Sequence, residues 1–204
     1  MYTKFLKRTG DFLIALIALT LLLPVFIFIL IFLTFANRGK PFFYQHRPGY
    51  KERIFRIIKF RTMNDRKDMS GDLLPDNQRL TSIGAFIRKT SLDEIPQLLN
   101  VIKGDMSIIG PRPLLIRYLP FYTDHERKRH SVRPGITGLA QVSGRNLLPW
   151  EERLALDVEY VQNLSFALDC TILVKTFQRV LTSKDVVADP QSVMIDLDEY
   201  RKKT

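Results

Sequence analysis

The residues best suited to chemistry are two adjacent carboxylates, Asp93 and Glu94, which lie between Ser91 and Pro96. The spacing Ser-x-x-Glu before an apolar run is typical of a capping box, in which Glu94 would fold back onto the backbone of Ser91. Pro96 argues against that register, because it would fall where a helix needs a backbone N–H. With Asp93 as the cap, Pro96 lies in the first turn, where the missing donor costs nothing. We therefore expect the pair at a helix N-terminus, which also favours anions such as phosphate.

Three arginines in loops rich in glycine and proline could oppose these carboxylates: Arg112, Arg133 and Arg145. Carboxylates together with substrate phosphates are the usual way in which a protein holds Mg²⁺, and arginine matches phosphate bidentately. An aspartate can also attack phosphorus directly, which forms an aspartyl-phosphate type of intermediate. Each arginine taken alone is more often a surface residue, but the combination indicates phosphate chemistry.

A β-hairpin is predicted ahead of the carboxylate pair, with strands near 42–45 and 54–63 and a turn around 48–50. Lys59 and Arg61 lie two residues apart on the second strand, so they project from the same face. A solvated strand face explains these two cations equally well.

Helices are predicted around and after the pair. Residues 81–89 indicate a short helix, and apolar residues at i, i+3, i+4 and i+7 over 95–102 predict a second one. Three loops with glycine, proline and arginine residues are expected at 110–113, 133–138 and 143–146. Further helices are expected over 150–163 and 166–181. The sequence therefore predicts a mainly α fold with a small β-hairpin.

The predicted helix over 166–181 is amphipathic, with one apolar face formed by Ile172, Leu173, Phe177, Val180 and Leu181. Such a helix can lie at a membrane interface, and it can equally pack on the protein's own core. Beyond residue 183 the chain is a polar tail of mixed charge.

The N-terminal segment from Phe12 to Ala36 carries no charge. As a straight helix of about 25 residues it would cover more than the ~30 Å hydrocarbon core of a bilayer, which predicts a single spanning helix. A signal peptide is disfavoured because the apolar run is too long and ends in a poor cleavage site. Pro24 in the middle would kink the helix into halves of one leaflet each.

Basic residues flank both ends of this segment, at Lys4, Lys7 and Arg8 before it and at Arg38 and Lys40 after it. Because Lys and Arg near a membrane segment prefer the cytoplasmic side, a spanning helix would leave one cluster outside. A re-entrant helix-break-helix keeps both inside. We therefore expect a membrane hairpin over 1–36, a compact cytoplasmic domain with interfacial amphipathic helices over 37–182, and the tail over 183–204.

The overall composition favours an anionic partner. The 204 residues suit one domain, and the net charge of +10 fits nucleic acid, anionic lipid or phosphorylated small molecules. No nucleic-acid recognition module is evident, and aromatic residues do not interleave with the basic ones, so we expect no nucleic-acid partner. A membrane-tethered scaffold would explain the anchor and the charge but leaves the carboxylate pair without a role. Cys170 is the single cysteine, which excludes an intramolecular disulfide and fits a reducing compartment.

Four motifs in order resemble the bacterial sugar transferases, the monotopic phosphoglycosyl transferases that start glycan assembly on a polyprenyl-phosphate carrier. They are Lys59-Phe-Arg-Thr-Met63, the run from Arg88 to Ser107, Gly110-Pro-Arg-Pro113 and the run from Arg133 to Arg145. The resemblance extends from about Lys4 to Leu181, and the length resembles the small members of the family.

The resemblance implies that a UDP-sugar gives its sugar phosphate to a polyprenyl phosphate, usually undecaprenyl phosphate, with release of UMP. It implies that Asp93 is the nucleophile and that Glu94 helps to hold Mg²⁺. Further positions that match the family's site are Lys59, Arg88, Arg112, Arg145 and Asp157. For Asp157 an i, i+4 ion pair with Arg153 is an equally good explanation.

The resemblance also implies location at the cytoplasmic face of the bacterial inner membrane, among membrane lipids, with a re-entrant helix that breaks at Pro24. Some members have serine just before that proline, but this chain has Leu23. The hydroxyl that could satisfy the freed backbone groups is therefore missing, and we expect the break to be held differently. Family members use hexoses, N-acetylhexosamines and modified sugars, and no residue here selects among them.

Overall fold

The structure is a computed structural model that describes residues 2–144, 148–182 and 195–203. Its helices are α1 (Lys7–Ala36), α2 (Asp76–Arg79), α3 (Ser82–Lys89), α4 (Gln97–Lys103), α5 (Asp124–Arg127), α6 (Leu139–Ser143), α7 (Trp150–Gln162), α8 (Phe166–Thr182) and α9 (Leu197–Lys203). Its strands are β1 (Phe42–Pro48), β2 (Ile54–Phe60), β3 (Ser107–Ile109) and β4 (Gly135–Thr137). Short turns of other helix types are η1 (Tyr2–Leu6), η2 (Tyr50–Glu52), η3 (Leu92–Glu94), η4 (Ile116–Phe121) and η5 (Lys128–Ser131).

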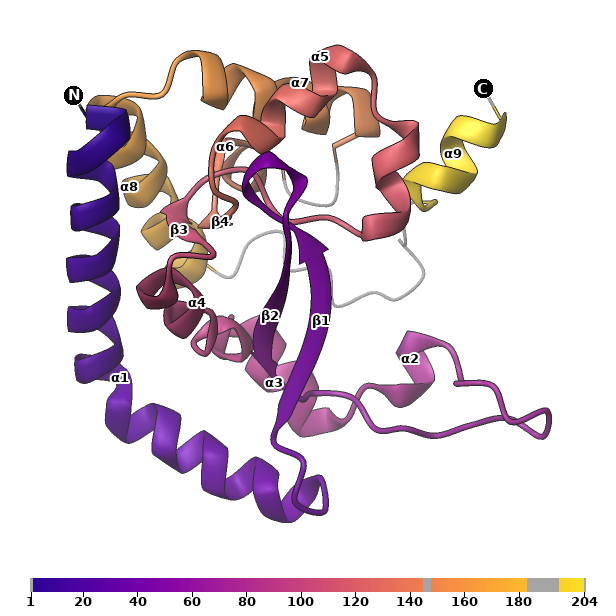
Figure 1. The fold of residues 1–204 in the computed structure, drawn as a ribbon. Helices are drawn as coiled ribbons and strands as arrows, with labels where there is room; N and C mark the ends of the chain where they lie inside the picture. The colour runs from indigo at the N-terminus through magenta and orange to yellow at the C-terminus, as the bar shows by residue number, and fades with distance from the viewer. Residues whose placement is uncertain (1, 145–147, 183–194, 204) are drawn as a thin grey trace.

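The predicted mainly helical fold with a small antiparallel hairpin is confirmed. Strands β1 and β2 pair from Phe42 opposite Phe60 to Pro48 opposite Ile54, and they stand in front of the helices in Figure 1. Ile57 and Phe60 of β2 are both buried in the main core. Because they are three residues apart in a strand, they do so from opposite faces of β2. The hairpin thereby places Lys59 at a defined position beside the domain.

A second sheet was not predicted. Strands β3 and β4 pair in parallel, with Ser107 opposite Gly135, although residues 133–138, which contain β4, were expected to form a loop. That expectation was wrong because the glycines here mark close packing. A Cβ on Gly110 would lie 2.4 Å from the carbonyl oxygen of Arg133, and one on Gly135 would lie 2.1 Å from the nitrogen of Gly110. Only glycine lets these two segments approach so closely.

The main hydrophobic core joins α1, β2, α4, β3 and α8. It includes the fully buried side chains of Phe60, Val101, Met106 and Ile172. A second cluster holds Leu114, Tyr118, Tyr122, Trp150, Leu154 and Leu197. Leu197 belongs to α9, so the polar tail ends in a helix that packs on η4, while residues 183–194 lie outside the described residues.

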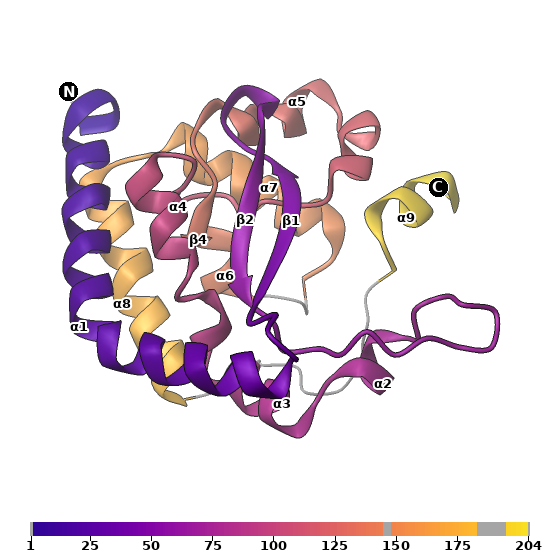
Figure 2. The same cartoon turned by 60° about the horizontal axis from the view of Figure 1, so that its bottom comes forward.

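Helix α1 bends sharply in its middle, as both Figure 1 and Figure 2 show. Pro24 lies inside the helix and removes one backbone donor. One turn upstream, the Thr20 hydroxyl donates to the carbonyl of Leu16 at 2.9 Å, a contact that itself tends to bend helices. The Thr20 hydroxyl thus lies one turn before Pro24 and binds the carbonyl of Leu16, not the Thr20 carbonyl that Pro24 leaves without its helical donor.

One face of α1 packs on the domain and the other is exposed. Ala15, Ile29 and Leu33 are buried in the main core, whereas Phe28 and Phe35 are 71% and 82% exposed. Within the described residues, α1 is the one helix long and apolar enough to cross a membrane. An exposed apolar face of this size is typical of a surface that contacts lipid or another protein. The helix is therefore compatible with membrane association.

Two of the basic residues that precede the apolar segment, Lys7 and Arg8, bind the domain. Lys7 forms an ion pair with Asp169 at 2.7 Å, and Arg8 donates to the carbonyls of Val101 and Ile102 at 2.6 and 2.9 Å. These two cations therefore fasten the start of α1 to α8 and to the end of α4.

The sequence left open whether the apolar face of α8 lies at a surface or packs on the protein's own core, and the structure shows both. Ile172 is fully buried, but Phe166, Val174 and Phe177 are exposed, so the apolar face predicted over 166–181 divides between the core and the surface. Helix α8 lies beside the first half of α1 in both views (Figures 1 and 2).

Candidate active site

The carboxylate pair lies in η3, the turn between α3 and α4. Ser91 adopts a left-handed conformation with φ of 57°, which turns the chain from one helix to the next at a cost of about 1 kcal/mol. Ser91 makes no side-chain cap, and α4 begins at Gln97 with Pro96 at its N-cap. Both capping registers considered for this segment were therefore wrong, because Glu94 binds cations instead of backbone.

Two cations converge on Glu94. Its Oε1 accepts from Lys59 Nζ at 2.7 Å and from Arg112 Nη2 at 2.9 Å. Burial alone would raise the pKa of Glu94, but the neighbouring guanidinium and ammonium groups outweigh burial and hold the pKa well below its usual range. Glu94 is therefore ionised and sits between a strand residue and a loop residue that are 53 positions apart in sequence.

Asp93 is in a different state from its neighbour. It is 9% exposed, and within the described residues no hydrogen bond reaches its carboxylate. Burial, followed by the adjacent charge of Glu94, raises the pKa of Asp93 to about 6, while Lys59, Arg88 and Arg112 act in the opposite sense. At neutral pH it is an ionised, unengaged carboxylate beside three cations, which suits a nucleophile toward phosphorus.

Asn100 sets the position of Lys59 relative to this pair, although no sequence motif pointed to it. Its Nδ2 donates to the carbonyl of Arg56 at 2.8 Å, and its Oδ1 accepts from the backbone N–H of Ile58 at 3.1 Å. This fully buried side chain joins α4 to the open edge of β2. A polar residue between Leu99 and Val101, in an otherwise apolar helix, was the signal that could have revealed it.

Arg88 is held at the end of α3 by Thr62, to which its Nε donates at 2.9 Å. Gly84 brings α3 against the strand end, since a Cβ there would lie 1.9 Å from the Thr62 carbonyl. The guanidinium lies near enough to lower the pKa of Asp93. The structure thus brings Lys59, Arg88 and Arg112 together around Asp93 and Glu94.

The family model described as bacterial sugar transferase matches residues 2–183. The chain belongs to this family.

Several curated proteins are similar to this sugar transferase. It is 49% identical to an uncharacterized sugar transferase, EpsL, of Bacillus subtilis, over 89% of this chain and 90% of that protein. It is 38% identical to the exopolysaccharide production protein ExoY of Rhizobium meliloti, over 87% and 86% of the two chains. It is 40% identical to the undecaprenyl-phosphate galactose phosphotransferase of Salmonella typhimurium, over 88% of this chain but 41% of that longer protein.

The structure places Asp157 behind the site of this sugar transferase. Asp157 is buried on α7 and accepts from Arg129 Nη2 at 2.7 Å and from Nε at 3.0 Å. Within the described residues its short ion pair is with Arg129, and the charge of Arg153 also acts to lower the pKa of Asp157. Arg129 also donates to the carbonyl of Arg112 at 2.6 Å. Asp157 is therefore linked to the site through a residue that the sequence motifs did not single out.

One other predicted arginine, Arg133, is not brought to the pair. Arg133 donates to the carbonyl of Gly104 at 2.8 Å, at the opposite end of α4. Arg145 lies outside the described residues.

The donor set fits a magnesium ion that arrives with a phosphate substrate. Within the described residues no cluster of three or more His, Cys, Asp or Glu side chains forms, so Asp93 and Glu94 are the available carboxylates at this site. Mg²⁺ characteristically takes one or two carboxylates and completes its octahedron with waters and substrate phosphates. Glu94, already ionised, is the better ligand of the two.

Proposed function

We propose that this protein transfers sugar 1-phosphate from a UDP-sugar to undecaprenyl phosphate and releases UMP. The observation that carries the proposal is the unengaged Asp93 carboxylate beside Glu94, with Lys59, Arg88 and Arg112 around the pair. The names of two relatives support it: the galactose phosphotransferase above, and a UDP-glucose:undecaprenyl-phosphate glucose-1-phosphate transferase of Xanthomonas campestris, 38% identical to this chain.

In the first step an Asp93 oxygen attacks the sugar-bearing phosphorus of the UDP-sugar. The bond from that phosphorus to the bridging oxygen breaks, and UMP leaves with the electron pair. An aspartyl-phosphosugar remains on the protein. Lys59, Arg88 and Arg112 neutralise the anionic diphosphate, without which a carboxylate could not approach phosphorus. Because Asp93 accepts no hydrogen bond within the described residues, none has to be broken before the attack.

Mg²⁺ is the cofactor that we propose for this step, with Glu94 as its protein ligand. When bound, it would neutralise charge on the substrate phosphates and on the departing UMP. Lys59 and Arg112 keep Glu94 ionised and in place.

In the second step the phosphate of the lipid attacks the acyl phosphate. The bond between phosphorus and the Asp93 oxygen breaks, which regenerates the carboxylate and yields the polyprenyl-diphosphate-sugar. One small site serves the water-soluble donor and the lipid acceptor in turn, so ping-pong kinetics are expected.

The apolar surfaces support a monotopic protein at the cytoplasmic face of the bacterial inner membrane, with α1 as a re-entrant helix. The outer face of α1 and the side chains of Phe86 on α3 and Phe177 on α8 are exposed and apolar. Arg88 and Phe86 belong to the same short helix, so a lipid surface against α3 would lie close to the site. This arrangement would let the lipid phosphate reach Asp93 without leaving the interface.

The test is UMP release by the purified full chain in lipid nanodiscs, from a panel of UDP-sugars, with and without undecaprenyl phosphate and Mg²⁺. We expect sustained release with one UDP-sugar when lipid phosphate and Mg²⁺ are present, and a single stoichiometric burst when the lipid is left out. No release with any UDP-sugar would contradict the proposal and favour a membrane-tethered scaffold. Release without a burst would retain the reaction but exclude the covalent intermediate.

A further inference from the structure

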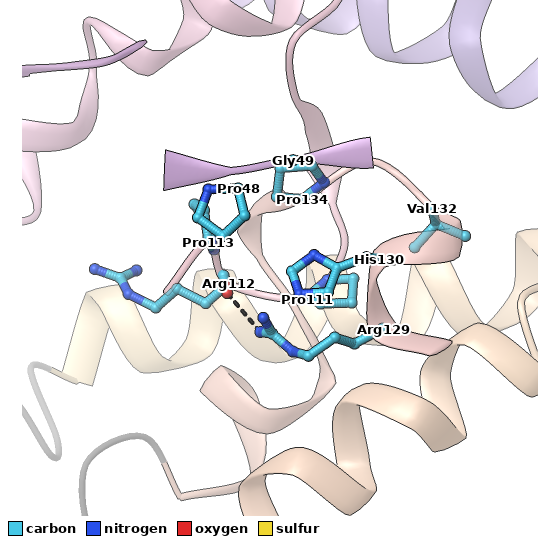
Figure 3. A pocket seen from close by; sticks show the side chains of 9 residues that line it. All are labelled: Pro48, Gly49, Pro111, Arg112, Pro113, Arg129, His130, Val132 and Pro134. Carbon is cyan, nitrogen blue, oxygen red and sulfur yellow. Dashed lines mark hydrogen bonds between the residues drawn. The ribbon is translucent and has the colours of Figure 1, made fainter. Parts of the chain in front are cut away.

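Arg129 occupies a buried position between a carboxylate and the main chain of a site residue. Its side chain is 1% exposed and that of Asp157 is 2% exposed. One guanidinium edge binds Asp157 Oδ2, and Nη2 also donates to the carbonyl of Arg112. Figure 3 shows this contact as a dashed line, with the Arg112 side chain extending in the other direction.

The backbone at Arg112 is stiff, so holding its carbonyl also aims its side chain. Pro111 and Pro113 flank it; each proline fixes its own φ, and Pro113 restricts Arg112 to extended conformations. The carbonyl bound by Arg129 and the side chain that reaches Glu94 therefore start from the same restricted stretch of backbone. A shift of the carbonyl would be transmitted to the Arg112–Glu94 contact.

Stability alone does not account for this pair. A buried ion pair can often be replaced by apolar residues of similar volume without loss of stability, because such a replacement removes the desolvation cost of both charges. An apolar pair at these positions could fill the space but could not donate to the Arg112 carbonyl. The donor function is the part that packing cannot replace.

We propose that Arg129 and Asp157 form a positioning pair that orients Arg112 on Glu94 for the transfer reaction. Asp157 fixes the guanidinium of Arg129, and Arg129 fixes the main chain of Arg112. Neither residue contacts substrate. This role rests on the proposed function and replaces the substrate-binding role that the family resemblance implies for Asp157.

The decisive variant is the double replacement Arg129→Met/Asp157→Leu, measured in nanodiscs for unfolding midpoint, kcat and KM. We expect an unfolding midpoint at or above that of the wild type and a KM for UDP-sugar within about threefold. We expect kcat to fall about ten- to a hundredfold, since a small misplacement of a charged group costs this much. Arg201→Met is the matched control, because it removes an ion pair with Glu126 that lies outside the site, and it should leave kcat unchanged.

A double-mutant cycle with Arg112 separates positioning from a structural role. Arg112→Gln should reduce kcat strongly in the wild type and only slightly in the Arg129→Met/Asp157→Leu background, because Arg112 is already misplaced there. An equal loss in both backgrounds, or a folded double variant with the kcat of the wild type, would overturn the proposal.

Should the double variant unfold, Asp157→Asn tests the same point. It keeps the shape of Asp157 but weakens its hold on Arg129, so kcat should fall while the protein stays folded. Wild-type kcat in this folded variant would also overturn the positioning role. Inactivity of the wild type with every UDP-sugar would instead be a failure of the proposed function, so the two failures are distinguishable.

Discussion

Two clusters of charged side chains, one at the start of α1 and one in the active site, use similar residues in opposite ways. In the first, which we term the anchor cluster, Lys7, Asp11, Tyr160 and Asp169 join α1 to α7, α8 and β3. Asp169 accepts from Lys7 at 2.7 Å and from Tyr160 at 2.8 Å, and Asp11 accepts from the backbone N–H of Ile108 at 3.1 Å. Each of these carboxylates is therefore hydrogen-bonded.

The active-site cluster leaves one carboxylate unengaged. Glu94 takes both direct ionic contacts, from Lys59 and Arg112, and Asp93 accepts no hydrogen bond within the described residues. Burial and the charge of Glu94 consequently raise the pKa of Asp93. A buried carboxylate with hydrogen-bond partners contributes to structure. A buried carboxylate without them is costly in free energy, and such groups are found at functional sites.

The largest effect expected from this contrast is the loss of activity in Asp93→Asn. The amide keeps the shape of the side chain but cannot attack phosphorus, so turnover should fall by at least about a thousandfold. The measurements are UMP release and covalent labelling by a UDP-sugar carrying a radioactive β-phosphate. Asp124→Asn, an exposed change on α5, is the control. Normal turnover in Asp93→Asn would remove Asp93 as the nucleophile.

In the anchor cluster we expect a loss of stability. Asp169→Ala leaves the buried Lys7 ammonium and the Tyr160 hydroxyl without their shared partner, which should lower the free energy of unfolding by about 3 kcal/mol. Denaturant unfolding in detergent measures this. The matched control is Asp65→Ala. The Asp65 side chain is 62% exposed, so its ion pair with Arg61 should contribute less than about 1 kcal/mol. Equal effects of the two changes would contradict the assignment of an anchor.

Asn100 tests how α4 joins the start of α1 to the active site. The carboxylate pair lies just before the first residue of α4, and Arg8 of α1 binds a carbonyl in its last turn. Asn100→Ala removes the side-chain partners of two backbone groups of β2, the N–H of Ile58 and the carbonyl of Arg56. We expect a loss of about 2 kcal/mol in unfolding free energy. We also expect a fall in kcat, because β2 would no longer hold Lys59 in place against Glu94. Unchanged kcat in the folded variant would show that β2 is positioned by other contacts.

A stability effect of the opposite sign is expected in Asp93→Asn, which should gain stability. Because the folded pKa of Asp93 is about 6 and lies above its ordinary value, the folded state binds more protons than the unfolded state between pH 4 and 6. Wild-type stability should therefore fall as pH rises through this window and stay lower above it. Without Mg²⁺, the variant should be about 3 kcal/mol more stable than the wild type at pH 8, and the difference should vanish below about pH 4. A variant less stable at pH 8 would mean that the Asp93 carboxylate is stabilised by the site.

The local elements of this protein were predictable from sequence. The hairpin, α3, α7 and α8 follow from patterns of two or 3.6 residues and from turn residues within a few positions of one another. Thr81, for example, caps α3 through the backbone N–H of Gly84, three residues away. The motifs around Asp93 and Glu94 also sufficed to indicate the family, because the residue types themselves carry the resemblance.

Contacts between distant segments were not predictable in this way. Lys7 binds Asp169 across 162 positions, and Arg129 binds Asp157 across 28. Neither partner can be inferred from residue type, since every lysine or arginine is an equally good donor until packing brings one of them close. For the same reason Arg133, which resembles a phosphate clamp by motif, binds Gly104 instead.

The sequence by itself therefore determined which residues could perform the chemistry and which segments would be helix, strand or apolar anchor, because those properties depend on side-chain type and short-range spacing. Only the tertiary structure decided which charges are satisfied. It pairs Lys7 with Asp169 and leaves the Asp93 carboxylate with a raised pKa. It also links Asp157 to Arg112 through Arg129. The physical reason is that the energy of a buried charge depends on its partners and on its distance from water, and both are set by packing.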